Sequence, residues 1–217
     1  VFGSPVHTAV EGGAVPVSVL PDLVGQELVV EGVASMYTGG YYAGGGNVKF
    51  YLADESGGVQ VWVPGGEGSV NIHVGDQVRV KGDLQIYRGA LELVVNDLAD
   101  VEVIKRNEPV PDWVLTIASL GQAANDSSLA GKLVQVNGTV ARNEEFSYSY
   151  ELDLVDDSGQ LLTLYVDKLT NINVEAIAGG QQFYATGILE MYDTRLQLYP
   201  RLHTVLERIY PCLLYTS

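Results

Sequence analysis

Four side chains on two expected strands of this chain could hold a ligand by ring stacking and hydrogen bonding. They are Lys49 and Tyr51 in the segment NVKFYLAD, and Gln60 and Trp62 in the segment GGVQVWV. Because side chains alternate between the two faces of a strand, all four are expected on one exposed face, opposite the apolar residues. Aromatic rings beside a cation form a stacking platform for nucleic-acid bases, and each stack contributes about 1–3 kcal/mol. The four residues therefore predict a ligand-binding face.

The segments that join neighbouring strands add further candidates. The glycine-rich segment 36–47, MYTGGYYAGGGN, carries three tyrosines, and the expected turn YRGA carries a Tyr-Arg pair. A second interpretation stays open, because Tyr and Trp also pair across strands simply to cover a sheet face. The predicted ligand-binding residues are Lys49, Tyr51, Gln60, Trp62, Tyr41, Tyr42, Tyr87 and Arg88.

Two pairs of neighbouring carboxylates offer oxygen ligands of the kind that Ca²⁺ prefers. Asp54 and Glu55 form one pair, and Asp156 and Asp157 form the other. Neither pair lies in a loop with alternating ligands such as Asp-x-Asp-x-Asp-Gly, so we expect acids that cap turns. The chain has no nucleophile elbow, no Ser/His/Asp set and no phosphate-binding glycine loop before a helix. We predict no catalytic residue, no metal site and no cofactor.

The composition indicates an acidic β protein. Of 217 residues 47% are hydrophobic, and Val, Tyr, Thr and Gly are abundant, which favours strands. The net charge of −15 is spread evenly, since residues 1–105 carry 5 Lys/Arg and 13 Asp/Glu and residues 106–217 carry 7 and 14. Neither half is a basic module, which disfavours a broad contact surface for nucleic-acid phosphates. No apolar run is long enough to cross a membrane.

Cysteine and histidine are sparse, and the last residues depart from the preceding pattern. Cys212 has no partner, which excludes a disulfide framework and a cysteine-based metal site. The three histidines, His7, His73 and His203, are far apart and have no metal-ligand spacing. The final segment CLLYTS can be written back as TGT CTC TTA TAC ACA TCT, which resembles a transposon end used for sequencing libraries. We therefore expect residues 212–217 to be a non-native tail.

The chain contains an internal repeat. The segments VKGDLQIYRGALEL and ATGILEMYDTRLQL lie 105 positions apart and share a Gly, a Leu, a Tyr and a closing Leu-x-Leu. Two further matches have offsets of 106 and 102, and drifting offsets indicate loops of different length between fixed strands. The matched ranges are 80–93 with 185–198, 24–34 with 130–140, and 52–58 with 154–160.

Each copy of the repeat reads as five strands. A three-stranded meander, a longer excursion and a second hairpin are the order of the OB-fold, a small Greek-key barrel. A β-sandwich would need seven strands in each copy. We predict an all-β protein with two tandem five-stranded OB-fold barrels joined by a short Pro-containing linker. The strands expected in the first copy are 27–37, 47–54, 58–63, 77–87 and 91–103, with the excursion at 64–76.

The predicted organisation follows from the repeat and from the proline-containing segment RNEPVPDW. Such a linker suggests two semi-rigid beads rather than one fused core. The predicted parts are an N-terminal extension at 1–13, the first barrel at 14–105, the linker at 106–113, the second barrel at 114–211 and the tail at 212–217.

The pattern of residues along the first copy resembles that of bacterial OB-fold domains in secreted multidomain proteins. Such domains are found beside extracellular endonucleases. The second copy departs from this pattern at Gly180-Gln181 and at Asp193-Thr194, which are both expected turns. The residues that carry the resemblance are Gly25, Val30, Gly32, Asp54, Ser56, Gly57, Gly75, Asp76, Val78, Val80, Gly82, Leu84, Tyr87 and Gly89.

The resemblance implies a piece of a larger bacterial protein that is secreted or lies at the cell surface. Neighbouring domains of the same parent chain are then expected, and the parent could be an extracellular nuclease or another hydrolase. Together with the aromatic face, the resemblance implies a non-catalytic region that binds single-stranded nucleic acid weakly through the first barrel. The alternative is an acidic spacer, or a module that contacts a protein or glycan.

The second copy offers a weaker site for nucleic acid. Tyr165 stands where the first copy has Trp62, but Glu151 and Asp153 replace the Lys-Tyr pair opposite it. Two carboxylates on this face repel phosphate, which favours a structural or protein-contact role. The tyrosines of FSYSY (146–150) are expected at its rim.

Overall fold

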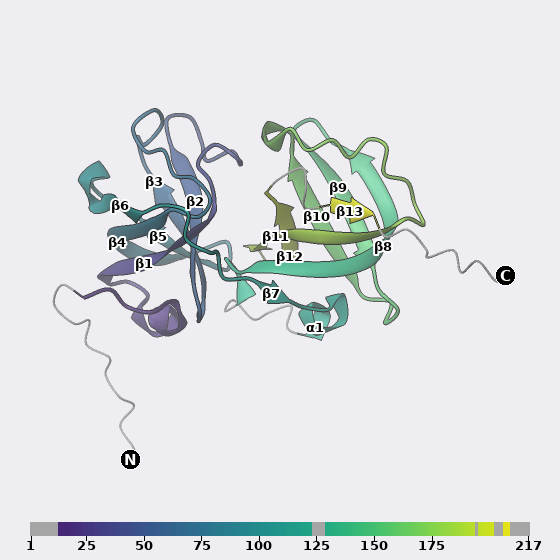
Figure 1. Cartoon of the computed structure of the whole chain (residues 1–217), viewed down its shortest axis with the longest axis horizontal. Helices are drawn as coiled ribbons and strands as arrows, with labels where there is room; N and C mark the ends of the chain where they lie inside the picture. Colours follow the sequence, from purple (N-terminus) through teal and green to yellow (C-terminus); the bar gives the residue numbers. More distant parts are fainter. Residues whose placement is uncertain (1–12, 123–128, 194, 202–205, 209–217) are drawn as a thin grey trace, which may run out of the picture.

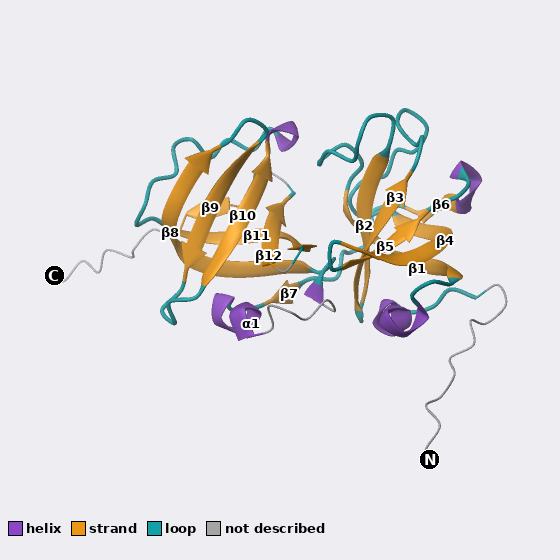
Figure 2. Ribbon diagram, turned by 180° about the vertical axis from the view of Figure 1, so that it is seen from behind, coloured by secondary structure: helices purple, strands orange, loops and turns teal. Residues whose placement is uncertain are grey.

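The computed structural model describes residues 13–122, 129–193, 195–201 and 206–208. It consists of two β-barrels that lie beside each other (Figures 1 and 2). The predicted extension other than Gly13, the tail at 212–217, and His7, His203 and Thr194 lie outside the described residues.

The first barrel closes through five strands in the order β1-β2-β3-β5-β4, with β4 pairing back to β1. Strands β3 and β5 run parallel and the other neighbours run antiparallel. A further strand, β6, pairs with β4. The elements are η1 (Val17–Leu23), β1 (Glu27–Met36), β2 (Val48–Asp54), β3 (Gly57–Val63), β4 (Gln77–Tyr87), β5 (Ala90–Val94), η2 (Leu98–Asp100) and β6 (Val101–Lys105).

The second barrel repeats this order as β8-β9-β10-β12-β11, with β11 pairing back to β8 and with β10 and β12 parallel. This arrangement in both copies is that of the OB-fold, so the predicted fold class is confirmed. The elements are β7 (Trp113–Val114), α1 (Ile117–Gln122), β8 (Leu133–Glu145), β9 (Ser149–Val155), β10 (Leu161–Asp167), η4 (Lys168–Thr170), β11 (Gln182–Tyr192), β12 (Arg195–Pro200) and β13 (Leu206–Arg208).

One predicted strand is wrong in its extent. The segment 91–103 was expected to be continuous, but β5 ends at Val94 and β6 begins only at Val101. Between them Asp97 caps the short helix η2, because its Oδ1 accepts a hydrogen bond from the backbone N–H of Ala99 at 3.0 Å. An Asn-Asp pair favours such a turn over a strand.

The alternation predicted for the ligand-bearing strands is correct. Phe50 and Leu52 of β2 and three valines of β3 enter the core of the first barrel. Leu162, Leu164 and Val166 of β10 enter the core of the second barrel. The side chains between these positions therefore point away from the barrel cores, as expected.

The repeated glycine of β4 and β11 is explained by the strand that packs beside it. A Cβ atom on Gly82 would lie 2.4 Å from the carbonyl oxygen of Val94. A Cβ atom on Gly187 would lie 2.5 Å from the carbonyl oxygen of Tyr199. Because each neighbour is backbone and cannot rotate away, both copies need glycine where the fifth strand crosses the fourth.

The acids of the repeated hairpin turn hold the short helix that precedes each barrel. Asp54 Oδ2 accepts a hydrogen bond from the backbone N–H of Val17 at 2.8 Å. Asp156 Oδ2 accepts one from the backbone N–H of Ala118, also at 2.8 Å. The other oxygen of each carboxylate bonds to N–H groups of its own turn. These contacts give the turn acids a structural role.

The two barrels share a buried interface, so the expected pair of semi-rigid beads is wrong. A separate apolar cluster, distinct from both cores, contains Met36 and Tyr51 of the first barrel and Leu133, Ile188 and Tyr199 of the second. Barrel-to-barrel hydrogen bonds add to it, including Tyr41 Oη to the Pro200 carbonyl at 2.5 Å and Arg201 Nη1 to the Ser35 carbonyl at 2.9 Å. The strands supply this contact, which a linker sequence cannot reveal.

Candidate binding surface between the barrels

The face predicted to bind a ligand is largely covered by the second barrel. Tyr51, Gln60 and Tyr41 are only 1%, 4% and 4% exposed. Tyr51 and Gln60 point out of the first barrel as predicted, but the expectation that they reach solvent is wrong. Tyr41, predicted as a ligand-binding residue of the joining segment, is also buried. Lys49 and Trp62 lie at the border of the interface and remain partly exposed. The accessible part of the predicted face is therefore its edge.

A chain of polar side chains crosses the buried interface. Tyr51 Oη bonds to Gln60 Oε1 at 3.0 Å and also to the Glu190 carboxyl of the second barrel. Gln60 Nε2 donates to Glu92, and Gln85 Nε2 donates to the other oxygen of Glu92 at 2.7 Å. A hydroxyl has one hydrogen to donate. Tyr51 can therefore donate to an ionised Glu190 carboxylate, or donate to Gln60 and accept from Glu190 when that carboxyl is protonated.

Burial favours that protonated form. It raises the pKa of the Glu190 carboxyl above its ordinary value of 4.5, although Lys49 and the hydrogen bond with Tyr51 act in the opposite direction. The nearby Glu92 carboxylate adds to the increase in pKa. Burial also raises the pKa of Tyr51 well above 10.0, so its hydroxyl keeps its hydrogen. Both groups favour a neutral interface.

Glu190→Gln is expected to stabilise the protein more at high pH than at low pH. The raised pKa means that the Glu190 contribution to stability is complete below its ordinary value of 4.5 and is lost as the pH rises through the folded-state pKa. Glutamine donates to Tyr51 at every pH. The free energy of unfolding of the variant relative to wild type should rise by about 1.4 kcal/mol for each unit by which the pKa is raised.

Urea denaturation at a series of pH values checks this prediction. Glu102→Gln changes an exposed carboxylate and serves as the control. A difference between Glu190→Gln and wild type that stays constant with pH would show that the carboxyl does not titrate in the folded state.

A first cluster of cation and rings lies at one edge of the interface. Lys49 Nζ lies 5.9 Å from the ring centre of Tyr41 and 5.7 Å from that of Tyr199. The Tyr199 ring in turn stacks on Tyr165, with centres 5.0 Å apart and planes 26° apart. Trp62 pairs with Lys49 across β2 and β3, and its Nε1 donates to the Ala43 carbonyl at 3.2 Å. We call Lys49, Trp62, Tyr165 and Tyr199 the seam cluster.

A second cluster forms where the equivalent hairpins of the two barrels meet. The guanidinium of Arg88 lies 4.4 Å from the ring centre of Tyr192 and 5.7 Å from that of Tyr87. Tyr87 is 49% exposed and Tyr192 is 46% exposed. Hydrogen bonds to both tyrosine side chains raise the pKa of Arg88. We call Tyr87, Arg88 and Tyr192 the hairpin cluster.

The two turns of the hairpin cluster share a left-handed backbone at one equivalent position. Arg88 and Asp193 occupy equivalent positions and have positive φ angles of 50° and 57°. The departure of the second copy from the family pattern at Asp193 therefore keeps the left-handed backbone of this position.

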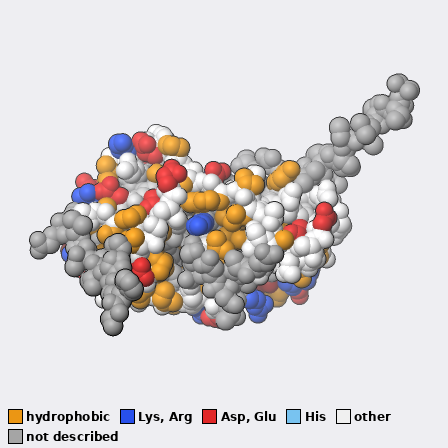
Figure 3. All heavy atoms as spheres, turned by 90° about the horizontal axis from the view of Figure 1, so that it is seen from below, with side chains coloured by type: hydrophobic (Ala, Val, Ile, Leu, Met, Phe, Trp, Pro, Cys, Tyr) orange, Lys and Arg blue, Asp and Glu red, His pale blue; other side chains and the backbone are white. Residues whose placement is uncertain are grey.

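Both clusters contain a cation without an ion pair, and Lys105, Lys132, Arg195 and Arg201 are also without one in the described part of the chain. Arg79, Lys81, Arg106, Arg142 and Lys168 all form ion pairs with carboxylates. In contrast, the side chains of Lys49 and Arg88 have no carboxylate oxygen within 4.0 Å among the described residues. On the face shown in Figure 3, Lys and Arg side chains are few and lie among acidic and hydrophobic ones.

The second barrel carries acids on its corresponding face, as predicted. Arg142 is shared among Asp153 at 2.7 Å, Glu151 at 3.5 Å and Glu144. Partial burial acts to raise the pKa of Asp153, but hydrogen bonds from Arg142 and Thr163 outweigh it and lower the pKa. Asp153 is therefore held ionised, and this face has an excess of negative charge.

Tyr192 and Tyr199 were not predicted as site residues. Tyr192 is the repeat equivalent of Tyr87, so the internal repeat carried a signal that could have found it. Tyr199 aligns with Val94, which gives no such signal. Tyr42, a predicted residue, is 71% exposed but belongs to neither cluster; its backbone N–H lies 3.4 Å from Asp167 Oδ2.

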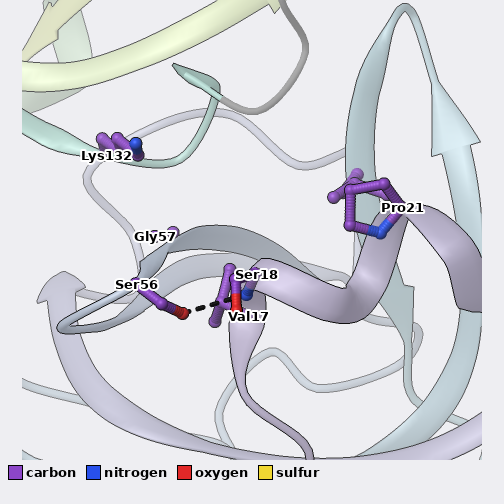
Figure 4. Close-up of a pocket in the computed structure, with 8 residues that line it drawn as sticks. Val17, Ser18, Pro21, Ser56, Gly57 and Lys132 are labelled. Carbon is purple, nitrogen blue, oxygen red and sulfur yellow. Dashed lines mark hydrogen bonds between the residues drawn. The ribbon is translucent and has the colours of Figure 1, made fainter. Parts of the chain in front are cut away.

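A small pocket of about 190 Å³ lies at the junction of the barrels, and none of its lining residues belongs to either cluster (Figure 4). Its walls include η1, the hairpin turn of the first barrel and Lys132 of the second barrel. The backbone N–H of Ser18 donates to Ser56 Oγ across it at 2.9 Å. No group of three or more metal-ligating side chains occurs among the described residues. The pocket contains none of the predicted site residues.

Comparisons with known proteins give one relative in sequence and several distant likenesses in structure. The chain is 29% identical over 161 residues to endonuclease YhcR of Bacillus subtilis (strain 168), and the match covers 73% of this chain but 13% of that protein. No family model matches the chain.

Structures of similar shape resemble this chain only distantly. The tetrameric p202 HIN2 has a TM-score of 0.40 at 17% identity, covering 84% of this chain and 93% of that one. The S. pombe Stn1-Ten1 complex has a TM-score of 0.32 at 16% identity, covering 36% of this chain and 59% of that one. The fold assignment rests on strand order and closure. In the part of the chain that the structure describes, no helix has the length and apolar character of a membrane span.

Proposed function

We propose that the docked barrels form a non-catalytic region that binds single-stranded nucleic acid weakly, through the seam and hairpin clusters. The observation that carries the proposal is the placement of Lys49 and Arg88, which lie over tyrosine rings without an ion-pair partner among the described residues. Rings for bases and cations for phosphates are the two elements that such binding needs.

The overall charge sets the strength of this binding. A net charge of −15 repels phosphate at long range, and only a few cations are available for direct contact. Binding that uses few phosphate contacts has a shallow dependence on salt. We therefore expect affinity to be weak overall and to fall only modestly between low and physiological ionic strength.

The parent protein is proposed to be a larger bacterial nuclease or other hydrolase that is secreted or lies at the cell surface. The similarity to endonuclease YhcR supports this proposal, and the matched region spans 13% of that protein. Catalysis is then assigned to other parts of the parent chain, and the two barrels hold the substrate strand near them.

Titration of a labelled oligothymidine at low salt, followed by fluorescence anisotropy, tests the proposed function. Trp62→Ala and Arg88→Ala should each weaken binding about tenfold or more, since one stacked base contributes about 1–3 kcal/mol. Lys105→Ala is the matched control for charge, because it removes an exposed cation on β6 outside both clusters. Absence of binding at high micromolar protein, or equal losses in control and cluster variants, would refute the proposal.

A further inference from the structure

Four large side chains with apolar or aromatic groups are exposed at one end of the barrel pair. They come from the β1–β2 connection of the first barrel and from the β8–β9 connection and η4 of the second. These connections lie at the upper end of the barrels in Figure 1. We call the four residues the rim cluster: Tyr42, Phe146, Tyr148 and Leu169, which are 71%, 41%, 82% and 54% exposed.

Backbone hydrogen bonds hold the rim cluster in place. The N–H of Phe146 donates to the Ser149 carbonyl at 2.8 Å and closes the β8–β9 turn. The N–H of Lys168 donates to the Tyr148 carbonyl at 3.0 Å, which ties this turn to η4. The rings are therefore presented by a constrained backbone, which lowers the entropic cost of binding.

Asp167 connects the two barrels within the rim. It is only 6% exposed, and its Oδ1 accepts from the N–H of Leu169 at 2.9 Å while its Oδ2 lies 3.4 Å from the N–H of Tyr42. The rim cluster thus belongs to the docked pair rather than to either barrel alone.

The charges around the rim cluster are mainly negative. Lys168 bonds to Glu145 at 2.6 Å and lies 5.0 Å from the Tyr150 ring, and Tyr150 Oη bonds to Glu175 at 3.0 Å. Lys168, the one cation among these side chains, is therefore already paired with a carboxylate. On the first-barrel side, Lys49 lies over Tyr41, the neighbour of Tyr42. On the second-barrel side, the charged residues of β8, β9, the end of β10, η4 and the segment after it are six carboxylates, Glu144, Glu145, Glu151, Asp153, Asp167 and Glu175, and two cations, Arg142 and Lys168.

We propose that the rim cluster is a docking surface for a basic segment of a protein partner. Exposed tyrosine rings attract Lys and Arg side chains through cation–π contact, and the surplus carboxylates provide the complementary charge. The same surplus excludes a polyanion such as nucleic acid. This surface borders the seam cluster, since Glu151 pairs with Tyr165 across β9 and β10, but it shares no residue with the seam or hairpin cluster. Its proposal does not rest on the proposed nucleic-acid function.

A fluorescein-labelled peptide of alternating arginine and glycine, titrated into the full chain, tests the docking surface. The double variant Tyr42→Ser/Tyr148→Ser should bind the peptide at least tenfold more weakly than wild type. Tyr184→Ser, which removes a 40% exposed tyrosine on β11, is the matched control and should bind like wild type. Urea denaturation of all three proteins excludes a folding defect.

Three results would overturn the proposal. Equal peptide affinity in all proteins would show that overall charge alone attracts the peptide. Binding of the neutral sugar maltohexaose that is lost in the double variant, with the peptide unaffected, would assign the rim to glycans. Displacement of the peptide by oligothymidine in wild type, with oligothymidine binding lost in the double variant, would assign the rim to nucleic acid instead.

Discussion

Gly58→Ala is expected to destabilise the protein by about 3 kcal/mol or more, because it forces the two barrels apart. A Cβ atom at Gly58 would lie 1.9 Å from the carbonyl oxygen and 2.2 Å from the carbonyl carbon of Gly131 in the second barrel. Both atoms are backbone, so no side-chain rotation relieves the overlap. Docking must shift, and the polar chain through Tyr51 and Glu190 is then disrupted.

Urea denaturation and small-angle scattering check the Gly58→Ala prediction together. The variant should unfold at lower urea concentration and should show a larger radius of gyration if the barrels separate. Gly45→Ala is the control, because nothing lies within 4 Å of a Cβ atom added there. Unchanged stability and radius of gyration in Gly58→Ala would mean that the barrels are not docked in this way.

Tyr51→Ala is expected to cost about 3–5 kcal/mol, the usual range for removing a large buried aromatic side chain. Tyr51 is 1% exposed and fills the interface beside Ile188 and Tyr199. Its loss also leaves Gln60 and Glu190 without their shared partner. Tyr51→Phe keeps the ring and should cost about 1–3 kcal/mol, the penalty for leaving buried polar groups unsatisfied.

The comparison with Trp62→Ala separates a structural residue from a binding residue. Trp62 is partly exposed at the edge of the interface, so its removal should lower oligothymidine affinity with a smaller loss of stability. Chemical denaturation and anisotropy titration of the same samples measure both properties. If Tyr51→Ala kept wild-type stability but lost oligothymidine binding, Tyr51 would be a ligand-binding residue and not a structural one.

Strand periodicity was sufficient to predict the fold but not the docking of the barrels. Apolar residues on alternate positions, such as Phe50 and Leu52, identify the inward face because the core selects them. The outward face is different, because tyrosine and glutamine suit solvent, a ligand or a second barrel equally well. Glu190 and Glu92 look like surface residues in the sequence, yet both are buried.

The candidate site was predictable only where one barrel supplies it. Lys49 and Trp62 share a cross-strand pair, so alternation brought them together. Tyr165 and Tyr199 reach them only because the second barrel is placed against the first. The position of one barrel relative to the other depends on surface complementarity, which local sequence patterns do not encode.

The hydrogen bonds and apolar contacts between the barrels also determine how weak contacts combine. If the barrels moved independently, a nucleic-acid strand bound at Lys49 would have to reach Arg88 and Tyr192 by diffusion in every encounter. With the spacing fixed, the second contact becomes intramolecular, and its effective concentration depends on the reach of the ligand alone. Under the proposed function, a ligand long enough to reach both clusters should therefore bind more tightly than a shorter one.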